Sequence, residues 1–210
     1  MLGPMTRRLS LIVTLLVALA AGLITSEAQA ANIPSQLAPG TRPHFFQFGF
    51  GVAEAFAGNR GRLDPARRYW GGFDSVKFHQ ELGFHLNGTA KGPALGVIFQ
   101  EEIGYHDPFN DIRTAYGFGV APRFQWDIQP VKNLGLYIAP NISVGYRGFT
   151  CPNCGVAHYV DIQSGINLRL MVVNRAIVWI NLPQFEFLVG PDANFVARVN
   201  FLTGVGVAFP

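Results

Sequence analysis

Charged residues are scarce in this chain. They make up 14% of its 210 residues, against about 25% in an ordinary soluble domain. Disordered proteins are rich in charge and poor in aromatic residues, so the composition excludes a disordered chain. The 16 Lys and Arg exceed the 13 Asp and Glu by only three, and the basic residues are scattered. Without a basic run that follows a phosphate backbone, the sequence argues against a nucleic-acid partner.

Cysteines and long apolar segments are scarce too. Two cysteines are too few for a fold held together by several disulfides. The uncharged apolar stretch 9–23 is shorter than the ~20 residues that a membrane-spanning helix needs. It follows Arg7 and Arg8 and precedes Ala28-Gln29-Ala30, a small-x-small pattern typical of signal peptidase cleavage. We therefore predict that residues 1–30 form a cleaved secretory signal peptide.

Glycine and phenylalanine are abundant, with 24 and 18 residues. From residue 44 onward, apolar and polar side chains alternate with the period of two that is typical of β-strands. All of the runs are longer than the ~5–6 residues of a globular strand, and a tilted strand crosses a membrane in ~9–11 residues. The run 176–189 is apolar on both faces, so its inward face stays unassigned. The eight runs are residues 46–53, 76–86, 95–105, 112–128, 136–147, 161–172, 176–189 and 194–209.

Short connections between the runs alternate with mostly longer ones. The short ones are 88–92, 129–133 and 174–175, and the others are 58–72, 106–111, 148–157 and 190–194. Short turns at one rim, longer loops at the other and an even number of strands are typical of a bacterial outer-membrane barrel. We predict an all-β fold, an eight-stranded antiparallel up-and-down transmembrane β-barrel over residues 44–210. A short N-terminal periplasmic segment, 31–43, precedes it.

Alternation alone leaves open whether the apolar or the polar face is outside. A soluble lipocalin-like barrel alternates with the same period of two, but its apolar face points inward. The polar face combines glycine with charges of both signs, whereas a solvated surface carries more Lys and Glu. Aromatic residues lie near the ends of the apolar faces, as in membrane barrels, and the first run lacks the Gly-x-Trp pattern of lipocalins. We therefore expect Phe118, Leu168 and Phe201 to face lipid. Gln163 and Asn200, on the opposite face, are expected to tolerate polar substitution.

The mature chain resembles the small eight-stranded outer-membrane β-barrels of Gram-negative bacteria, the group that includes the membrane domain of outer-membrane protein A. Its last run is similar to the C-terminal assembly strand of that family, with Phe201, Val205, Val207 and Phe209 on the apolar face. Pro210 departs from the pattern, because such chains usually stop at the aromatic residue. The resemblance implies an outer-membrane location, with membrane lipids, lipopolysaccharide and the barrel-assembly machinery as partners. It says little about activity.

The polar faces of the runs carry charges of both signs. They are Lys77, Glu81, Glu102, Arg113, Arg123, Arg147, Asp161, Arg169 and Arg198, with His79 and His85 beside them. Such a set fits an ion or proton pathway, an acid/base site or a salt-bridged plug. Eight strands leave an interior that side chains just fill, and buried charges are tolerated when they are paired. We favour the plug, with Arg147–Asp161 and Glu102–Arg113 as two of its ion pairs.

Cys151-Pro152-Asn153-Cys154 is the motif with reactive side chains. A redox site needs a thiolate of lowered pKa, usually at a helix N-terminus, and this motif precedes a strand. A structural zinc site needs four ligands, and only His158 is near. In an exported protein we therefore expect a structural disulfide between Cys151 and Cys154. We expect no metal and no cofactor.

The first long loop is basic and aromatic, and it is a candidate contact for anionic lipopolysaccharide or another surface ligand. Its residues of interest are Arg60, Arg62, Arg67, Arg68, Tyr69 and Trp70. The chain lacks the His-x-Ser pair of membrane-barrel lipid A deacylases, so we expect no enzymatic activity. The sequence thus predicts a non-enzymatic outer-membrane barrel with a plugged polar lumen and a surface-binding or envelope-structural role. The alternatives are a conduit or binder for small hydrophobic solutes and a soluble secreted lipocalin-like barrel.

Overall fold

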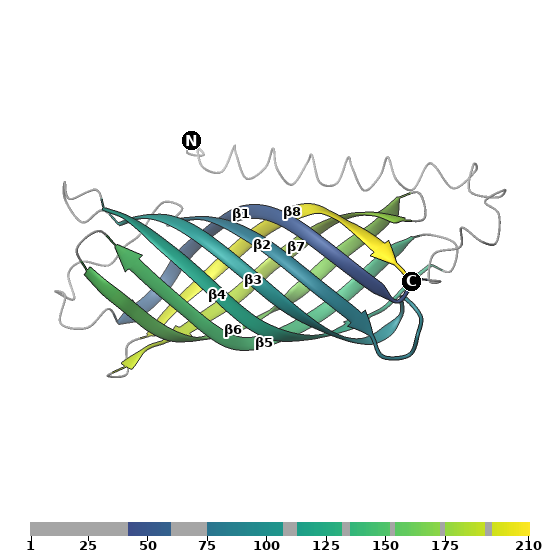
Figure 1. Cartoon of the computed structure of the whole chain (residues 1–210), viewed down its shortest axis with the longest axis horizontal. Helices are drawn as coiled ribbons and strands as arrows, with labels where there is room; N and C mark the ends of the chain where they lie inside the picture. The colour runs from purple at the N-terminus through teal and green to yellow at the C-terminus, as the bar shows by residue number, and fades with distance from the viewer. Residues whose placement is uncertain are drawn as a thin grey trace, which may run out of the picture. The chain divides into compact units, whose positions relative to one another are not determined.

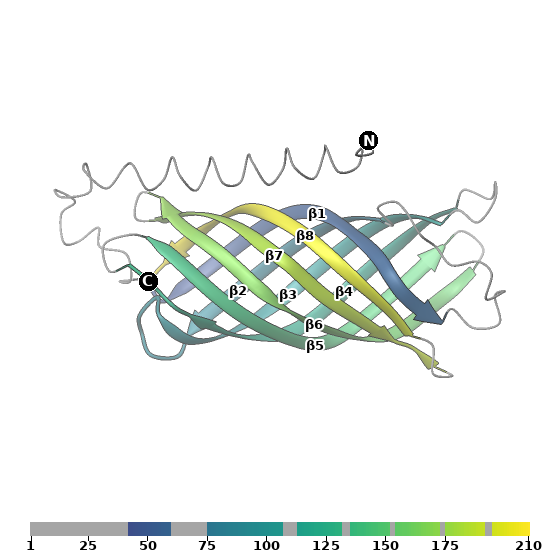
Figure 2. The same ribbon diagram turned by 180° about the vertical axis from the view of Figure 1, so that it is seen from behind.

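The computed structural model describes residues 42–59, 75–106, 113–131, 135–151, 154–172, 175–191 and 195–210. Every strand is antiparallel to its neighbours, and β8 pairs with β1, so the sheet closes into a barrel (Figures 1 and 2). The predicted eight-stranded up-and-down barrel is confirmed. The strands are β1 (His44–Asn59), β2 (Ser75–His85), β3 (Gly92–His106), β4 (Arg113–Asp127), β5 (Leu136–Cys151), β6 (Cys154–Val172), β7 (Ala176–Val189) and β8 (Phe195–Phe209).

Among the described residues, no helix has the length and apolar character needed to cross a membrane.

The strands are steeply inclined to the barrel axis (Figure 1). The stagger of the sheet can be followed from each residue to its paired residue on the next strand. Starting at His44 of β1 and going once around the barrel, this path returns to β1 at Glu54, ten positions further along the strand. Such a stagger is what the closure of a tilted sheet requires. One layer of the interior therefore collects residues from different positions in each strand. We call the end with the connections β2–β3, β4–β5 and β6–β7 the turn end, and the opposite end the loop end.

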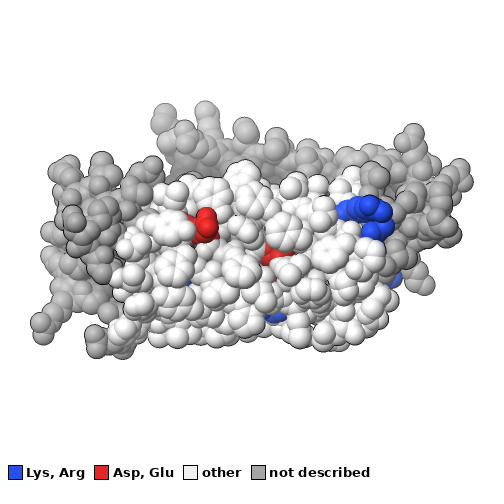
Figure 3. Space-filling model, in the orientation of Figure 1, with Lys and Arg blue, Asp and Glu red and all other residues white. Residues whose placement is uncertain are grey.

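The apolar faces of the strands point outward and the polar faces inward. Phe50 is 57% exposed and Phe201 44%, whereas Gln47 and Asn200 are completely buried. A water-soluble protein buries its apolar side chains and exposes its polar ones. This barrel does the reverse, so the soluble lipocalin-like alternative is wrong. Phe118, Leu168 and Phe201 all lie on the outer face. On the side shown in Figure 3, charged side chains are confined to a few small patches.

Glycines on the inner face make room for large rings. At Gly49 on β1, a Cβ atom would lie 2.3 Å from the indole ring of Trp179, and at Gly83 on β2 it would lie 2.1 Å from the ring of Phe45. Trp179 and Phe45 are 1% and 2% exposed, so these rings fill the interior where the sheet has no side chain. The glycine-rich polar face predicted from the sequence thus belongs to a narrow, filled barrel.

The inner face of β7, which the sequence left unassigned, changes parity within the strand. Trp179 and Asn181 point inward, Leu182 and Pro183 are both exposed, and Gln184 points inward again. The pairing with β8 shifts between Ile180 and Gln184. Proline has no N–H for the ladder and is confined to edges and bulges within sheets. A bulge at Pro183 therefore shifts the inward positions from odd-numbered to even-numbered residues, so no single period of two describes the whole strand.

The expected loop 148–157 is mostly strand, so that prediction is wrong. Strand β5 continues to Cys151 and β6 begins at Cys154, with Phe149 paired to Ala157. The rings of Phe149 and Tyr159 pack edge to face with centroids 5.8 Å apart. These aromatic contacts support the hairpin beyond the point where glycine and proline in the sequence indicated a loop.

Candidate functional site

The described part of the barrel interior holds equal numbers of buried cations and carboxylates. Eight of the nine charged residues predicted for the lumen are among them, and the side chain of Arg113 lies outside the described residues. Asp127 lies on the predicted polar face of the run 112–128 but was not included in the predicted lumen charges, and Glu186 lies in the unassigned β7. The ten residues, each at most 4% exposed, are Lys77, Arg123, Arg147, Arg169, Arg198, Glu81, Glu102, Asp127, Asp161 and Glu186.

Glu186 on β7 is the centre of a cluster near the loop end. Its carboxylate accepts two hydrogen bonds from Lys77 Nζ on β2, at 2.8 and 2.9 Å. Arg147 on β5 donates to the same carboxylate at 3.0 Å, and Arg198 Nε on β8 lies 3.5 Å from it. Charge-assisted hydrogen bonds of this kind are stronger than neutral ones. One carboxylate thus joins three strands that are far apart in the sequence.

Two further carboxylates complete this cluster. Arg147 donates to Asp161 at 2.9 Å, which brings together the pair predicted from neighbouring strands. Glu102 accepts from Arg198 and lies 3.8 Å from Lys77. For Glu102 the sequence pointed to Arg113 on β4, whereas its described charged partners are Arg198 on β8 and Lys77, its paired neighbour on β2. The tilt of the strands decides which charges meet, and this tilt was not deduced from the sequence.

The middle of the lumen is a hydrogen-bonded layer around Glu81. Its Oε2 atom accepts from Arg123 at 2.9 Å and from Gln47 at 3.1 Å, and it lies 3.3 Å from His79 Nε2. The His79 ring packs edge-on against Trp179, with centroids 5.3 Å apart. Ring, guanidinium and carboxylate therefore share the interior between the two ends of the barrel.

Gln163 connects the middle layer to the loop-end cluster. Its amide nitrogen donates to Gln100 at 2.8 Å and to Asp161 at 2.7 Å, and its oxygen accepts from Gln184 at 3.0 Å. Asn200 likewise accepts from Lys77 at 3.2 Å. Both side chains are completely buried. These positions are therefore more constrained than the alternation alone implied, since a buried donor or acceptor left without a partner is costly.

A third group of charges lies at the turn end of the lumen. Asp127 accepts from Arg169, from Gln125 at 2.8 Å and from His85 Nε2 at 2.6 Å. The other ring nitrogen of His85, Nδ1, lies 2.5 Å from the carbonyl oxygen of Pro43. The two ring nitrogens of His85 therefore lie between a carboxylate and a backbone carbonyl. His85 thus fastens the residues before β1 to the barrel.

The outer face carries the predicted assembly strand. Phe201, Val205 and Val207 of β8 are exposed and Phe209 is half-buried. Glu101 also points outward, although it breaks the apolar row of β3. Its pairing with β2 and β4 continues without a shift, so no bulge turns Glu101 inward and its carboxylate lies on the apolar face.

His158 on the outer face contacts Tyr146, whose hydroxyl oxygen lies 2.7 Å from Nδ1 of the ring. Ser164 lies six positions further along β6. Successive residues of a strand are ~3.3 Å apart, so this serine and histidine are too distant to act as a nucleophile and its base.

Several predicted site residues lie outside the described part of the chain. Among them is the basic aromatic group of the first long loop, which comprises Arg60, Arg62, Arg67, Arg68, Tyr69 and Trp70. The side chains of Cys151 and Cys154 also lie outside the description, although the two backbones are paired across β5 and β6. The disulfide therefore stays a prediction. Among the described side chains, no group of three or more His, Cys, Asp or Glu residues is arranged to hold a metal ion.

The chain is similar to solved outer-membrane barrels in structure but not in sequence. No protein-family model and no curated protein sequence matches it. Neisserial surface protein A matches with a TM-score of 0.54 at 11% identity, over 79% of this chain and 97% of that one. Two Pseudomonas aeruginosa structures match with lower TM-scores. The N-terminal barrel domain of OprF has a TM-score of 0.49 at 14% identity, over 80% of this chain and 98% of that one. The outer membrane protein OprG has a TM-score of 0.48 at 10% identity, over 82% of this chain and 98% of that one. The chain has the fold of the small eight-stranded outer-membrane barrels.

Proposed function

We propose that this protein is a non-enzymatic β-barrel of the bacterial outer membrane, exported with a signal peptide that is removed after residue 30. The observation that carries the proposal is the inverted distribution of side chains. Apolar residues such as Phe50 and Phe201 cover the outside, and the charged residues lie inside. A closed barrel satisfies all backbone groups of a membrane-spanning sheet, and an apolar outer band is what lipid requires.

Cell fractionation and gel mobility test this location. We expect the full chain, expressed in a Gram-negative host, to collect in the outer-membrane fraction. Because a closed barrel resists detergent until it is heated, the unheated protein should run faster on a denaturing gel than the boiled protein. A soluble species whose mobility does not change on heating would contradict the proposal.

The lumen is proposed to be closed to solutes. A passing ion would have to separate Glu186 from Lys77 and Arg147, whose contacts of 2.8 and 3.0 Å cross the interior. Separation of a buried pair leaves charges without partners in a medium of low dielectric constant, which is strongly unfavourable. Each of the ten buried charges in the described part of the lumen also has a partner of opposite sign. The protein is therefore structural or acts through its surface.

Conductance measurements test the closed lumen. In a planar lipid bilayer, we expect the purified barrel to give no stable current steps above the membrane baseline. A general porin inserted in the same bilayer is the positive control, and gel mobility before insertion verifies that the barrel is folded. Large, stable steps from the folded protein would show that the charge layers open.

The proposed surface role belongs to the loop that carries the four arginines at positions 60–68 together with Tyr69 and Trp70. Guanidinium groups bind phosphate and carboxylate in a bidentate manner, and aromatic side chains concentrate at membrane interfaces. This composition supports binding to anionic lipopolysaccharide around the barrel.

A further inference from the structure

Glu101 is a carboxylate within the apolar row on the outer face of β3. The side chain is exposed, and Phe99 and Ile103, the outward residues before and after it, are exposed as well. In the proposed membrane location, lipid therefore surrounds a carboxylate that lies between apolar side chains. Ionisable residues are rare in such places because they are costly there, and they usually mark a functional site.

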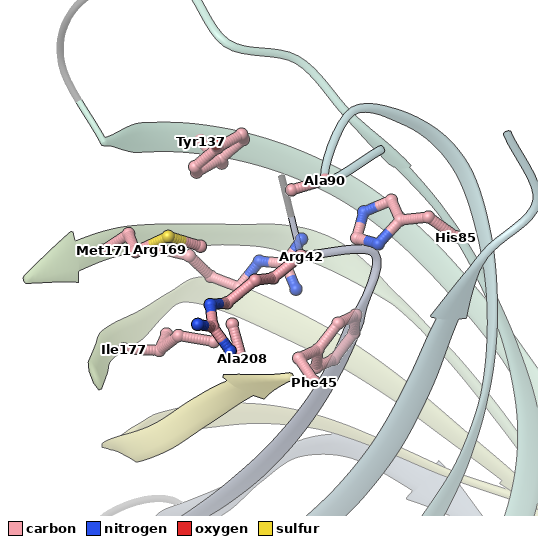
Figure 4. Close-up of a pocket in the computed structure, with 9 residues that line it drawn as sticks. All are labelled: Arg42, Phe45, His85, Ala90, Tyr137, Arg169, Met171, Ile177 and Ala208. Atoms are coloured by element: carbon pink, nitrogen blue, oxygen red, sulfur yellow. The ribbon is translucent and has the colours of Figure 1, made fainter. Parts of the chain in front are cut away.

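Glu101 forms no ion pair within the described part of the chain. The lysine and arginine side chains described in the strands all point into the barrel; they are Lys77, Arg123, Arg147, Arg169 and Arg198. Figure 4 shows Arg169 at the turn end, among the residues that line a pocket there. A second copy of the chain has the same described outer face, so its strands bring no such cation either. The cation for Glu101 therefore has to come from another molecule.

Aromatic residues lie on both sides of Glu101. Its paired residues are Phe78 on β2 and Phe118 on β4, and residues paired in this way have Cβ atoms about 4.5–5.5 Å apart. The Phe118 ring extends toward Gly148 on β5, where a Cβ atom would lie 2.9 Å from it, so this ring points away from Glu101. The carboxylate is therefore accessible from the lipid side, beside aromatic residues of the kind that attract organic ammonium groups.

The surroundings of Glu101 decide which cation fits. Ca²⁺ and Mg²⁺ need several oxygen ligands or bound waters, and the paired and neighbouring outward residues are apolar. An organic cation with an alkyl chain needs no further oxygen ligand, and its chain can contact the exposed residues Leu95, Val97 and Phe99 of the same strand. We propose that Glu101 binds lipophilic organic ammonium compounds dissolved in the membrane. The proposal rests on the proposed membrane location, because lipid has to surround the site.

Ile103 offers a reporter, because it is the next outward residue after Glu101 on β3. The barrel, labelled with ¹³C at its isoleucine δ-methyl groups and folded in phosphatidylcholine nanodiscs, is titrated with dodecyltrimethylammonium. Loss of one signal in Ile103→Leu assigns the resonance. We expect the Ile103 resonance to shift and to saturate with the mole fraction of the probe in the lipid. Dodecanol, which has the chain without the charge, and tetramethylammonium, which has the charge without the chain, should each produce a weaker response.

Substitutions separate this site from general partitioning of the probe into lipid. Glu101→Gln is expected to raise the half-saturating mole fraction about tenfold, because it keeps the shape of the side chain and removes the Coulomb attraction. Glu101→Asp, which keeps the charge, should restore much of the affinity. Glu54→Gln is the matched control, because Glu54 is a half-exposed carboxylate on the outer face of β1 whose paired residue is Val199 of β8. It lies outside the site, so this variant should leave the titration of Ile103 unchanged.

The opposite results would overturn the proposal. An equal response to dodecanol would mean apolar contact only, and an equal response to tetramethylammonium would mean a site in contact with water. The same titration in wild type and Glu101→Gln would exclude lipophilic ammonium compounds as the occupant and leave a basic side chain of a protein partner as the cation. Heat-dependent gel mobility of each sample verifies that the barrel is folded. A folded barrel without a response at Ile103 contradicts this proposal alone, whereas a chain that does not fold into lipid contradicts the proposed function.

Discussion

Phe201→Arg is expected to destabilise the folded barrel by about 2–4 kcal/mol, which is the cost of a basic side chain near the middle of a membrane barrel's outer face. Phe201 is 44% exposed, and it lies in the centre of the outward row of β8, between Phe195 and Phe209 at the strand ends. In lipid, the arginine would sit far from both interfaces. The measurement is the free energy of unfolding by urea in phospholipid vesicles.

Val131→Arg is the matched control for this substitution. Val131 is 43% exposed, like Phe201, but it follows β4 at the turn end, where the strand has already finished. Surface substitutions of that kind typically change stability by less than ~0.5 kcal/mol. A similar loss in both variants would show that lipid does not surround Phe201. Spontaneous folding of the wild-type chain in buffer without lipid or detergent would show that the apolar outer face does not need a membrane.

The strand order and the inward faces of most strands were predictable from the sequence, because period-two alternation places Gln47 and Phe48 on opposite faces whatever surrounds the barrel. The direction of the faces was also predictable, from the mixture of glycine and charges of both signs on the polar face. Strand β7 was the exception. Its inner face changes at Pro183, and a single period cannot describe a strand that contains a bulge. Glu186 was therefore missed.

The contacts within the lumen were less predictable than its composition. Arg147 and Asp161 belong to adjacent strands, so the sequence could bring them together. Lys77 reaches Glu186 from β2 to β7, and this contact depends on the stagger of the sheet and on the length of both side chains. The space-filling role of the glycines was equally hidden, since Gly49 accommodates Trp179 from a strand that is not its neighbour.

Glu186→Leu is expected to cost about 3–5 kcal/mol of unfolding free energy, because it removes one member of a buried ion network. Lys77, Arg147 and Arg198 would each lose a partner, and these side chains are at most 4% exposed. Asp161 and Glu102 would remain to share three positive charges. The same urea titration in vesicles measures the loss.

Two variants distinguish the lost ion network from a general effect of leucine. Glu101→Leu makes the same substitution on the outer face, where the carboxylate lies in the apolar row of β3, so the barrel should be unchanged or more stable in lipid. Lys77→Met combined with Glu186→Leu removes one cation with the anion. This double variant should recover much of the stability, because an apolar pair of similar volume replaces a buried ion pair at little cost. If Glu186→Leu were as stable as wild type, or the double variant were no better than Glu186→Leu, the carboxylate would not be the centre that holds β2, β5 and β8 to β7.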